Sequence, residues 1–169
     1  GILGMGRIGK KIAKIAKALG MIIHYHNRSK LTTDQEEGAN YHKDLKSLLS
    51  VSDVLSICCP ASKETINLIN KDTLEHLPKG AVVTNVARGD IVDDEALIDA
   101  LDRRKVYAVG LDVYKGEPNL NPGYLKHKGA FILPHLGSAT KQTRIAMANL
   151  AIDNMEEFFN TGSCKNKVN

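Results

Sequence analysis

The glycine pattern near the start of the chain is the feature that most limits how it can fold. It runs Gly4-Met5-Gly6-Arg7-Ile8-Gly9 and fits G-x-G-x-x-G. In such a turn the first glycine permits the bend, the second leaves room for a phosphate, and the third lets the next helix pack closely on its strand. The helix that follows presents free N–H groups and a partial positive charge to an anion.

The residues on either side of this pattern fit a strand, a glycine turn, a helix and a second strand. Ile2-Leu3 resembles the end of an apolar strand. Apolar residues then recur at helical spacing at Ile8, Ile12, Ile15 and Leu19. Gly20 is placed to end the helix, and 21–25 indicates the second strand. This context favours dinucleotide binding over a purely structural turn, with the binding residues Gly4, Gly6, Arg7, Ile8 and Gly9.

The rest of the chain alternates strands and helices nearly to its end. We expect strands over 54–59, 81–86, 106–113 and 130–133, and a polar loop over 30–40. A long amphipathic helix is expected over 139–160, with an apolar side formed by Ile145, Ala148, Ile152, Met155 and Phe159. The alternation predicts an α/β fold, a Rossmann-type doubly wound parallel sheet covered on both faces.

Composition excludes several classes of partner. The chain has 169 residues, a net charge of +4 with scattered lysines, and no Trp. These features argue against a nucleic-acid surface, and no run is long enough to span a membrane. The cysteines at 58, 59 and 164 have no disulfide or metal spacing, which predicts a reducing, cytoplasmic compartment. Cys58 and Cys59 lie in an apolar strand and are interpreted as buried, inert thiols.

The end of the second strand predicts the cofactor. An acidic residue there would bind the ribose 2′-hydroxyl of NAD, whereas an arginine accommodates the 2′-phosphate of NADP. Here Asn27 is neutral, Arg28 can pair with a phosphate, and Ser29 can add a hydroxyl. We therefore expect NADP(H) to be preferred, with NAD(H) possible; the alternative is an exposed strand end without a cofactor role. His24 and His26 share a strand face, but without a third ligand a structural role is favoured over a metal site.

Three later segments end strands and carry polar groups suited to one chemistry. They are 85–89, 110–118 and 133–138. In open α/β sheets the ligand crevice lies at the carboxyl ends of the strands, so these segments are expected to meet there.

At these segments the chain resembles the cofactor domain of the D-isomer-specific 2-hydroxyacid dehydrogenases, which include glyoxylate/hydroxypyruvate reductases. The likeness rests on the glycine motif, N-V-A-R-G-D-I-V-D, G-L-D-V-Y-K-G-E-P and L-P-H-L-G-S-A-T, in that order. The segment 25–29 is similar to NADPH-preferring glyoxylate reductases, notably fungal ones. The resemblance implies reduction of a small 2-oxoacid to the D-2-hydroxyacid.

The resemblance also implies the residues that act. Arg88, Glu117 and His135 are the implied catalytic set, and Asp112 is implied near the nicotinamide carboxamide. Histidine exchanges a proton near neutral pH and suits an acid for the developing alkoxide. Glutamate on its other ring nitrogen would favour the protonated form, and arginine suits a carboxylate. Residues that singly are ordinary loop residues are implied to line the cofactor: Cys59, Pro60, Thr65, Val86, Ala87, Gly137 and Ser138. Arg88 and His135 are implied to contact the cofactor as well as to act in catalysis.

The family has a second, substrate-binding domain, and nothing in this sequence precedes Gly1. We therefore expect a single NAD(P)-binding domain over 1–138 with a shortened first strand, and a helix and tail over 139–169 that would pack toward the absent domain. Such a chain is expected to be inactive alone, and the resemblance suggests a homodimer. The rival hypothesis is a non-catalytic, nucleotide-sensing module of the corepressor kind. An S-adenosylmethionine-binding fold would explain the glycine turn but none of the later motifs.

Overall fold

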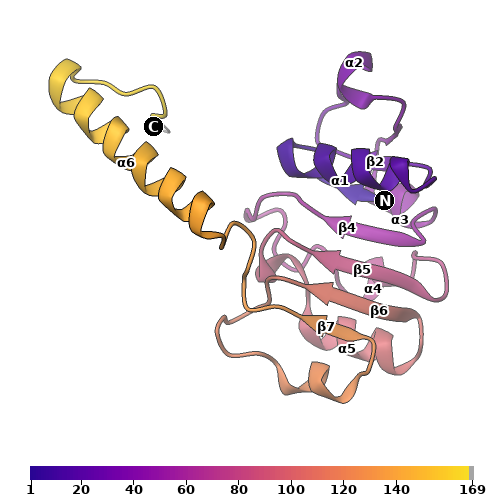
Figure 1. Cartoon of the computed structure of the whole chain (residues 1–169). Coiled ribbons are helices and arrows are strands. Elements are labelled where there is room, and N and C mark those ends of the chain that lie inside the picture. Colours follow the sequence, from indigo (N-terminus) through magenta and orange to yellow (C-terminus); the bar gives the residue numbers. More distant parts are fainter. Residues whose placement is uncertain (168–169) are drawn as a thin grey trace. The chain divides into compact units, whose positions relative to one another are not determined.

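A computed structural model describes residues 1–167. The chain divides into two compact units, Gly1–Pro134 and His135–Asn169. Within the described residues, the first unit holds a seven-stranded sheet in the order β3-β2-β1-β4-β5-β6-β7 (Figure 1). The strands are β1 (Ile2–Leu3), β2 (His24–His26), β3 (Asn40–His42), β4 (Val54–Ile57), β5 (Ala81–Asn85), β6 (Val106–Leu111) and β7 (Ala130–Ile132).

Helices connect these strands. They are α1 (Arg7–Ala18), α2 (Thr33–Glu36), α3 (Leu45–Leu49), α4 (Lys71–Leu74), α5 (Asp94–Asp102) and α6 (Lys141–Thr161), with 3-10 turns η1 (Gly89–Ile91) and η2 (Pro122–Lys126). All the neighbouring strand pairs are parallel. The chain runs from β1 outward to β2 and β3, then returns to the other side of β1 as β4. This strand order confirms the predicted doubly wound α/β fold. In such a fold a crevice opens where the connections diverge on the two sides of the first strand.

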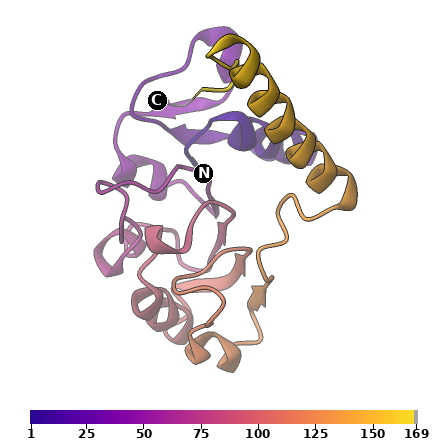
Figure 2. The ribbon, with the colours of Figure 1, turned by 90° about the vertical axis from the view of Figure 1, so that its left-hand side faces the viewer.

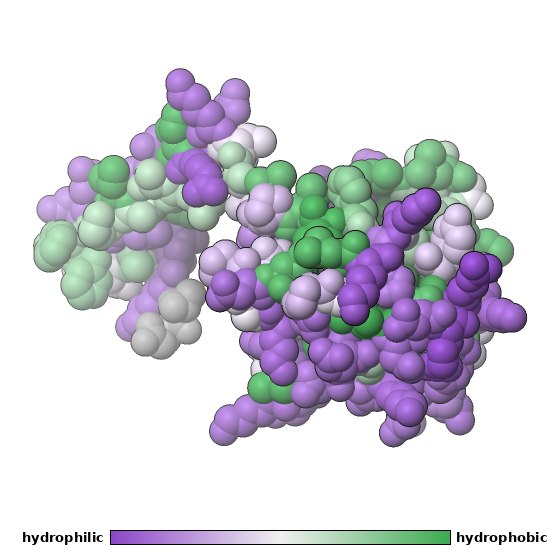
Figure 3. Space-filling view, turned by 90° about the horizontal axis from the view of Figure 1, so that it is seen from below, coloured by the Kyte–Doolittle hydropathy of each residue, from purple (hydrophilic) through white to green (hydrophobic). Residues whose placement is uncertain are grey.

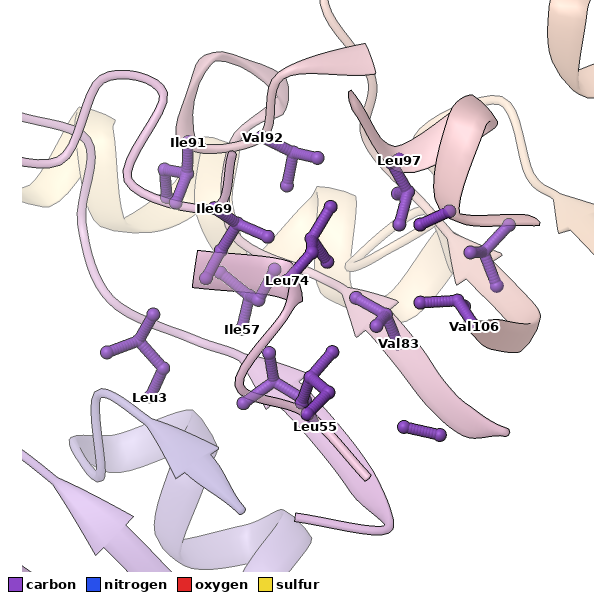
Figure 4. Close-up of a cluster of buried hydrophobic side chains, with 14 of the residues drawn as sticks. Leu3, Leu55, Ile57, Ile69, Leu74, Val83, Ile91, Val92, Leu97 and Val106 are labelled. Carbon is purple, nitrogen blue, oxygen red and sulfur yellow. The ribbon is translucent and has the colours of Figure 1, made fainter. Parts of the chain in front are cut away.

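Each face of the sheet has its own apolar core, because successive strand residues point to opposite faces. Ile2 packs with Tyr25 and with Ile12, Ala13 and Ala16 on the inner side of α1. Figures 1 and 2 show the ribbon of α1 beside the first strands of the sheet from two directions. Leu3 belongs to the larger core on the other face (Figure 4). That core joins strand residues such as Leu55, Ile57 and Val83 to α3, α4 and α5, and holds the β4–β6 half of the sheet together.

The inner side of α1 differs from the expected apolar stripe. Ile12 is half-buried, but Ile8, Ile15 and Leu19 are 57%, 64% and 78% exposed. The side that faces the sheet is made of small residues with Ile12: Gly9, Ala13 and Ala16. The glycine turn brings α1 so close to β1 that small side chains fit best there, which the spacing of large apolar residues does not reveal.

The segment expected to be a polar loop over 30–40 contains α2 and leads into a strand, β3. This strand pairs with β2 in the register His24↔Asn40 to His26↔His42. β3 consists of only three residues, Asn-Tyr-His, and lacks the alternation of apolar and polar residues by which a strand is recognised in a sequence. It is held by the β2 ladder and by the ring of Tyr41, which lies 5.3 Å from that of Tyr25.

The second unit is dominated by α6, which begins at the N-cap Thr140 and ends at Gly162 with φ 74°. Its expected single apolar side is not observed. Exposed apolar side chains occur on more than one side of the helix: Ile145, Met147, Leu150, Ile152, Met155, Phe158 and Phe159. Green, apolar side chains are accordingly visible at the surface of this helix in Figure 3.

The close approach of α1 to β1 can be tested at Gly9. A Cβ there would lie 2.6 Å from the carbonyl oxygen of Gly4 and 3.0 Å from Ile2. Gly9→Ala is therefore expected to lower the free energy of unfolding by about 1–3 kcal/mol, measured by urea denaturation. Gly6→Ala is the matched control, because no described atom lies within 4 Å of its Cβ position. Equal stability of the two variants would contradict the packing argument.

Candidate cofactor and active site

A pocket of about 610 Å³ opens at the carboxyl ends of β1, β2 and β4. It brings together these predicted cofactor residues: Gly4, Gly6, Asn27, Arg28, Ser29, Cys59, Pro60 and Thr65. The strands that supply them flank the point where the connections diverge from β1. The pocket therefore lies where a doubly wound sheet binds its ligand.

The glycine turn forms the floor of this pocket. Gly4 has φ 95°, and a Cβ there would lie 2.5 Å from the backbone nitrogen of Cys59. At Gly6 a Cβ would instead enter open space. Gly6 is also the N-cap of α1, whose first turn has no acidic residue. Open space before the N-terminus of a twelve-residue helix fits a phosphate group.

The other residues of the motif lie outside the pocket lining. Gly9 is buried against β1, whereas Arg7 and Ile8 are exposed on the first turn of α1. Gly9 thus acts through helix packing, the role that the third glycine was expected to have.

Asn27 ties the end of β2 to the glycine turn. Its Oδ1 accepts a hydrogen bond of 2.7 Å from the backbone N–H of Met5. The neighbouring N–H of Gly4 donates to the carbonyl oxygen of His26 over 3.0 Å. Asn27 therefore stabilises the turn, in addition to lining the pocket. Arg28 and Ser29 follow it and are exposed.

The loop after β4 forms another wall. Thr65 Oγ1 accepts a hydrogen bond from the Ser62 N–H over 2.7 Å and donates to the Pro60 carbonyl oxygen over 3.0 Å. Thr65 thus shapes the loop. Burial raises the pKa of the Cys59 thiol to about 11 and also raises the pKa of Cys58, so both thiols are protonated at neutral pH. This supports their interpretation as inert.

Asn85, the last residue of β5, organises the loop that carries Arg88. Its side chain is buried, accepts a 3.0 Å hydrogen bond from the Ala87 N–H and donates a 2.9 Å hydrogen bond to the Arg88 carbonyl oxygen. Its own carbonyl oxygen accepts from the Asp112 N–H over 3.0 Å. Asn85 thereby joins the end of β5, with Val86, to the end of β6.

Gly89 brings the Arg88 loop against the loop that carries Glu117. A Cβ at Gly89 would collide with the backbone of Tyr114 and Lys115. The Tyr114 N–H in turn donates a 3.0 Å hydrogen bond to Glu117 Oε1. The structure thus places two of the three predicted catalytic residues, Arg88 and Glu117, on adjoining loops.

The third predicted catalytic residue, His135, begins the second unit. The chain reaches it from β7, where the Leu133 N–H donates to the Leu111 carbonyl oxygen over 2.8 Å. His135 has φ 55° and Ser138 has φ 64°, with Gly137 between them in the same turn. The N–H of Ala139 donates to the Leu136 carbonyl oxygen, which closes this turn ahead of α6.

Some pocket residues were not predicted: His26, Cys58, Ser62, Glu64 and Leu68. Ser62 and Glu64 follow Pro60, which ends the strand next to β1, and that position could have indicated them. Asn85 could have been recognised as a polar residue at the end of an apolar strand.

His24 and His26 serve the sheet. His24 Nδ1 lies 2.8 Å from His42 Nε2, and His26 Nδ1 lies 2.8 Å from the His42 carbonyl oxygen. Burial, followed by the charge of His42, lowers the pKa of His24. Among residues 1–167, no three histidine, cysteine, aspartate or glutamate side chains are grouped to hold a metal ion.

The geometry of the site agrees with a sequence comparison. The family described as D-isomer specific 2-hydroxyacid dehydrogenase, NAD binding domain, matches residues 1–137. The chain belongs to this family. A glycerate dehydrogenase from Hyphomicrobium methylovorum is 42% identical over 161 residues, which are 94% of this chain and 50% of that protein.

Solved structures of the family share the fold closely. A glyoxylate reductase from Paecilomyes thermophila has a TM-score of 0.94 and 41% identity, covering 99% of this chain and 51% of that one. An NADPH-dependent glyoxylate/hydroxypyruvate reductase from Sinorhizobium meliloti, in complex with NADP and malonate, has a TM-score of 0.92 and 36% identity, covering 97% and 50%. The chain thus spans about half the length of the relatives it matches.

The organising role of Asn85 can be tested by truncation. Asn85→Ala is expected to lower the free energy of unfolding by about 1–3 kcal/mol, because the buried Ala87 N–H loses its partner. The measurement is urea denaturation. Asn40→Ala provides a control, since Asn40 is exposed and its side chain makes one 3.2 Å hydrogen bond to the Ile23 carbonyl oxygen. A change at position 85 no larger than that at position 40 would show that Asn85 does not hold the loop.

Proposed function

We propose that this chain is the NADPH-binding part of a reductase that converts a small 2-oxoacid, of the glyoxylate or hydroxypyruvate type, to the D-2-hydroxyacid. The observation that carries the proposal is the pocket with Arg28 at the end of β2 and the open glycine turn at its floor. Relatives with these activities in their names, including an NADPH-dependent one, support it.

The preference for NADPH rests on charge. The end of β2 offers a neutral Asn27, whose Oδ1 is engaged by Met5, and the exposed cation Arg28. In residues 1–167, Arg28 makes no hydrogen bond or ion pair at contact distance. A guanidinium in this state can form charge-assisted hydrogen bonds with a 2′-phosphate, and Ser29 adds a hydroxyl.

The proposed chemistry divides between the cofactor and side chains of this chain. NADPH, held by the glycine turn and Arg28, would supply the hydride that reduces the carbonyl carbon of the substrate. Arg88 binds the substrate carboxylate and polarises the carbonyl group. His135 donates a proton to the developing alkoxide, and Glu117 is proposed to orient its ring. The backbone N–H of Asp112 donates to the Asn85 carbonyl oxygen at the end of β5, and Asp112 would lie near the nicotinamide carboxamide.

We further propose a homodimer in a reducing, cytoplasmic setting, without a nucleic-acid partner. Exposed apolar residues on and after α1, including Ile15, Leu19 and Ile22, support an oligomer. The described cysteines are all free thiols. In the described part of the chain no helix is long and apolar enough to cross a membrane.

Calorimetric titration of this chain tests the cofactor preference. NADPH is expected to bind at least about tenfold more tightly than NADH, a difference of about 1.4 kcal/mol. Arg28→Ala is expected to remove that difference by weakening NADPH alone. Lys30→Ala is the matched control, because Lys30 is a nearby exposed cation outside the pocket lining. Equal or tighter binding of NADH by the unchanged chain would contradict the preference while leaving the fold intact.

Turnover tests the catalytic assignment in a full-length protein that contains this chain. Oxidation of NADPH with glyoxylate or hydroxypyruvate is followed by absorbance. His135→Ala is expected to lower kcat by about 10²- to 10⁴-fold, the usual contribution of a general acid. His76→Ala, at a half-buried histidine outside these loops, is the control and should leave kcat unchanged. Negligible turnover of the unchanged protein with every short 2-oxoacid would favour a nucleotide-sensing module instead.

A further inference from the structure

We infer that Glu64 is a specificity-determining residue of the cofactor pocket: its carboxylate is the counter-ion of Arg28 and competes with the 2′-phosphate of NADPH. This inference rests on the proposed NADPH site and adds to it a second residue, on a different loop, that limits the preference for NADPH over NADH.

Arg28 and Glu64 belong to the same pocket but come from strands on either side of β1. Arg28 follows β2, and Glu64 lies in the loop after β4. Both side chains are exposed at the surface of the described unit. A ligand group that binds Arg28 within this pocket is therefore in the same pocket as the Glu64 carboxylate.

The loop holds Glu64 in a defined place. Ser62 Oγ donates a 2.6 Å hydrogen bond to Glu64 Oε2. The Ser62 backbone N–H donates to Thr65 Oγ1, and the Thr65 N–H donates back to the Ser62 carbonyl oxygen over 3.0 Å. These bonds close a tight turn whose third residue is Glu64, so its charge is fixed to the pocket wall rather than carried on an unrestrained segment.

Electrostatics connects the two residues. The hydrogen bond from Ser62 lowers the pKa of Glu64 most and the backbone hydrogen bond at Glu64 comes next, while the positive charge of Arg28 makes a smaller contribution in the same direction. Glu64 is therefore a carboxylate at neutral pH and interacts with Arg28 through space. A 2′-phosphate that binds Arg28 replaces Glu64 as the negative group paired with the guanidinium. The Glu64 carboxylate then repels this phosphate. NADH has no such phosphate, so Glu64 should affect NADPH selectively.

The exposure of both groups sets the size of the effect. Exposed charge pairs contribute little because water and salt screen them, so Glu64→Gln is expected to tighten NADPH binding by about two- to fivefold at low ionic strength. Glutamine retains an oxygen that accepts the hydrogen bond from Ser62, so the variant removes the charge without releasing the turn. The affinity for NADH is expected to stay the same, and the gain in NADPH affinity is expected to shrink in high salt.

The test is calorimetric titration of the chain with NADPH and with NADH, at low and high salt. Asp72→Asn removes one negative charge from an exposed position outside the pocket lining and is the control. In an Arg28→Ala background, Glu64→Gln is expected to give a smaller gain, because the carboxylate no longer has a cation to neutralise. An unchanged NADPH-to-NADH affinity ratio, an equal change for both cofactors, or an undiminished gain without Arg28 would overturn the inference.

Failure of this inference is distinguishable from failure of the proposed function. If Arg28→Ala leaves NADPH affinity unchanged, the proposed NADPH site is wrong and the role of Glu64 is overturned with it. If Arg28→Ala weakens NADPH as expected but Glu64→Gln has no NADPH-specific effect, the role of Glu64 alone is wrong.

Discussion

The close approach of backbone segments at the glycine turn is the constraint on which the rest of the structure depends. At Gly4 the turn lies against the backbone of Cys59, and at Gly9 the helix lies against the carbonyl group of Gly4. These contacts join the end of β1 to the end of β4 and set α1 directly on the sheet. Between these two close contacts, a Cβ at Gly6 would meet no described atom within 4 Å. A site for an anion and a tightly packed helix are thus consequences of one arrangement.

A comparable constraint operates at the other half of the sheet. Asn85 uses its side chain and its backbone to join the end of β5 to the Arg88 loop and to Asp112. Gly89 then permits the Arg88 loop to contact the backbone of Tyr114, whose N–H binds Glu117. Buried amide groups of this kind must be paired, so the loop conformations are stabilised by the same bonds that bring polar residues together. The surface loops of the site are therefore positioned by residues that do not themselves carry out chemistry.

The cofactor pocket shows how charge is distributed around such a scaffold. One exposed cation, Arg28, comes from the β2 side of the pocket and one exposed carboxylate, Glu64, comes from the β4 side. Ser62 donates a hydrogen bond to the Glu64 carboxylate, whereas Arg28 has no ion pair at contact distance within residues 1–167. We propose that selectivity for a phosphate at this pocket depends on the balance of the two charges, each of which lies on a loop outside the strands of the sheet.

The sequence by itself determined the fold class, the glycine turn, most strands of the sheet and the residues at the end of β2, because these depend on local patterns. It also indicated Arg88, Glu117 and His135 through resemblance. Tertiary structure decided the inner side of α1, the pairing of β3 with β2, and the contacts of Asn85 and Glu64. The physical reason is that periodicity shows only which residues of a local segment are apolar. The close approach of two backbone segments, the pairing of a polar edge strand and the proximity of two charged side chains all depend on segments that are distant in the chain.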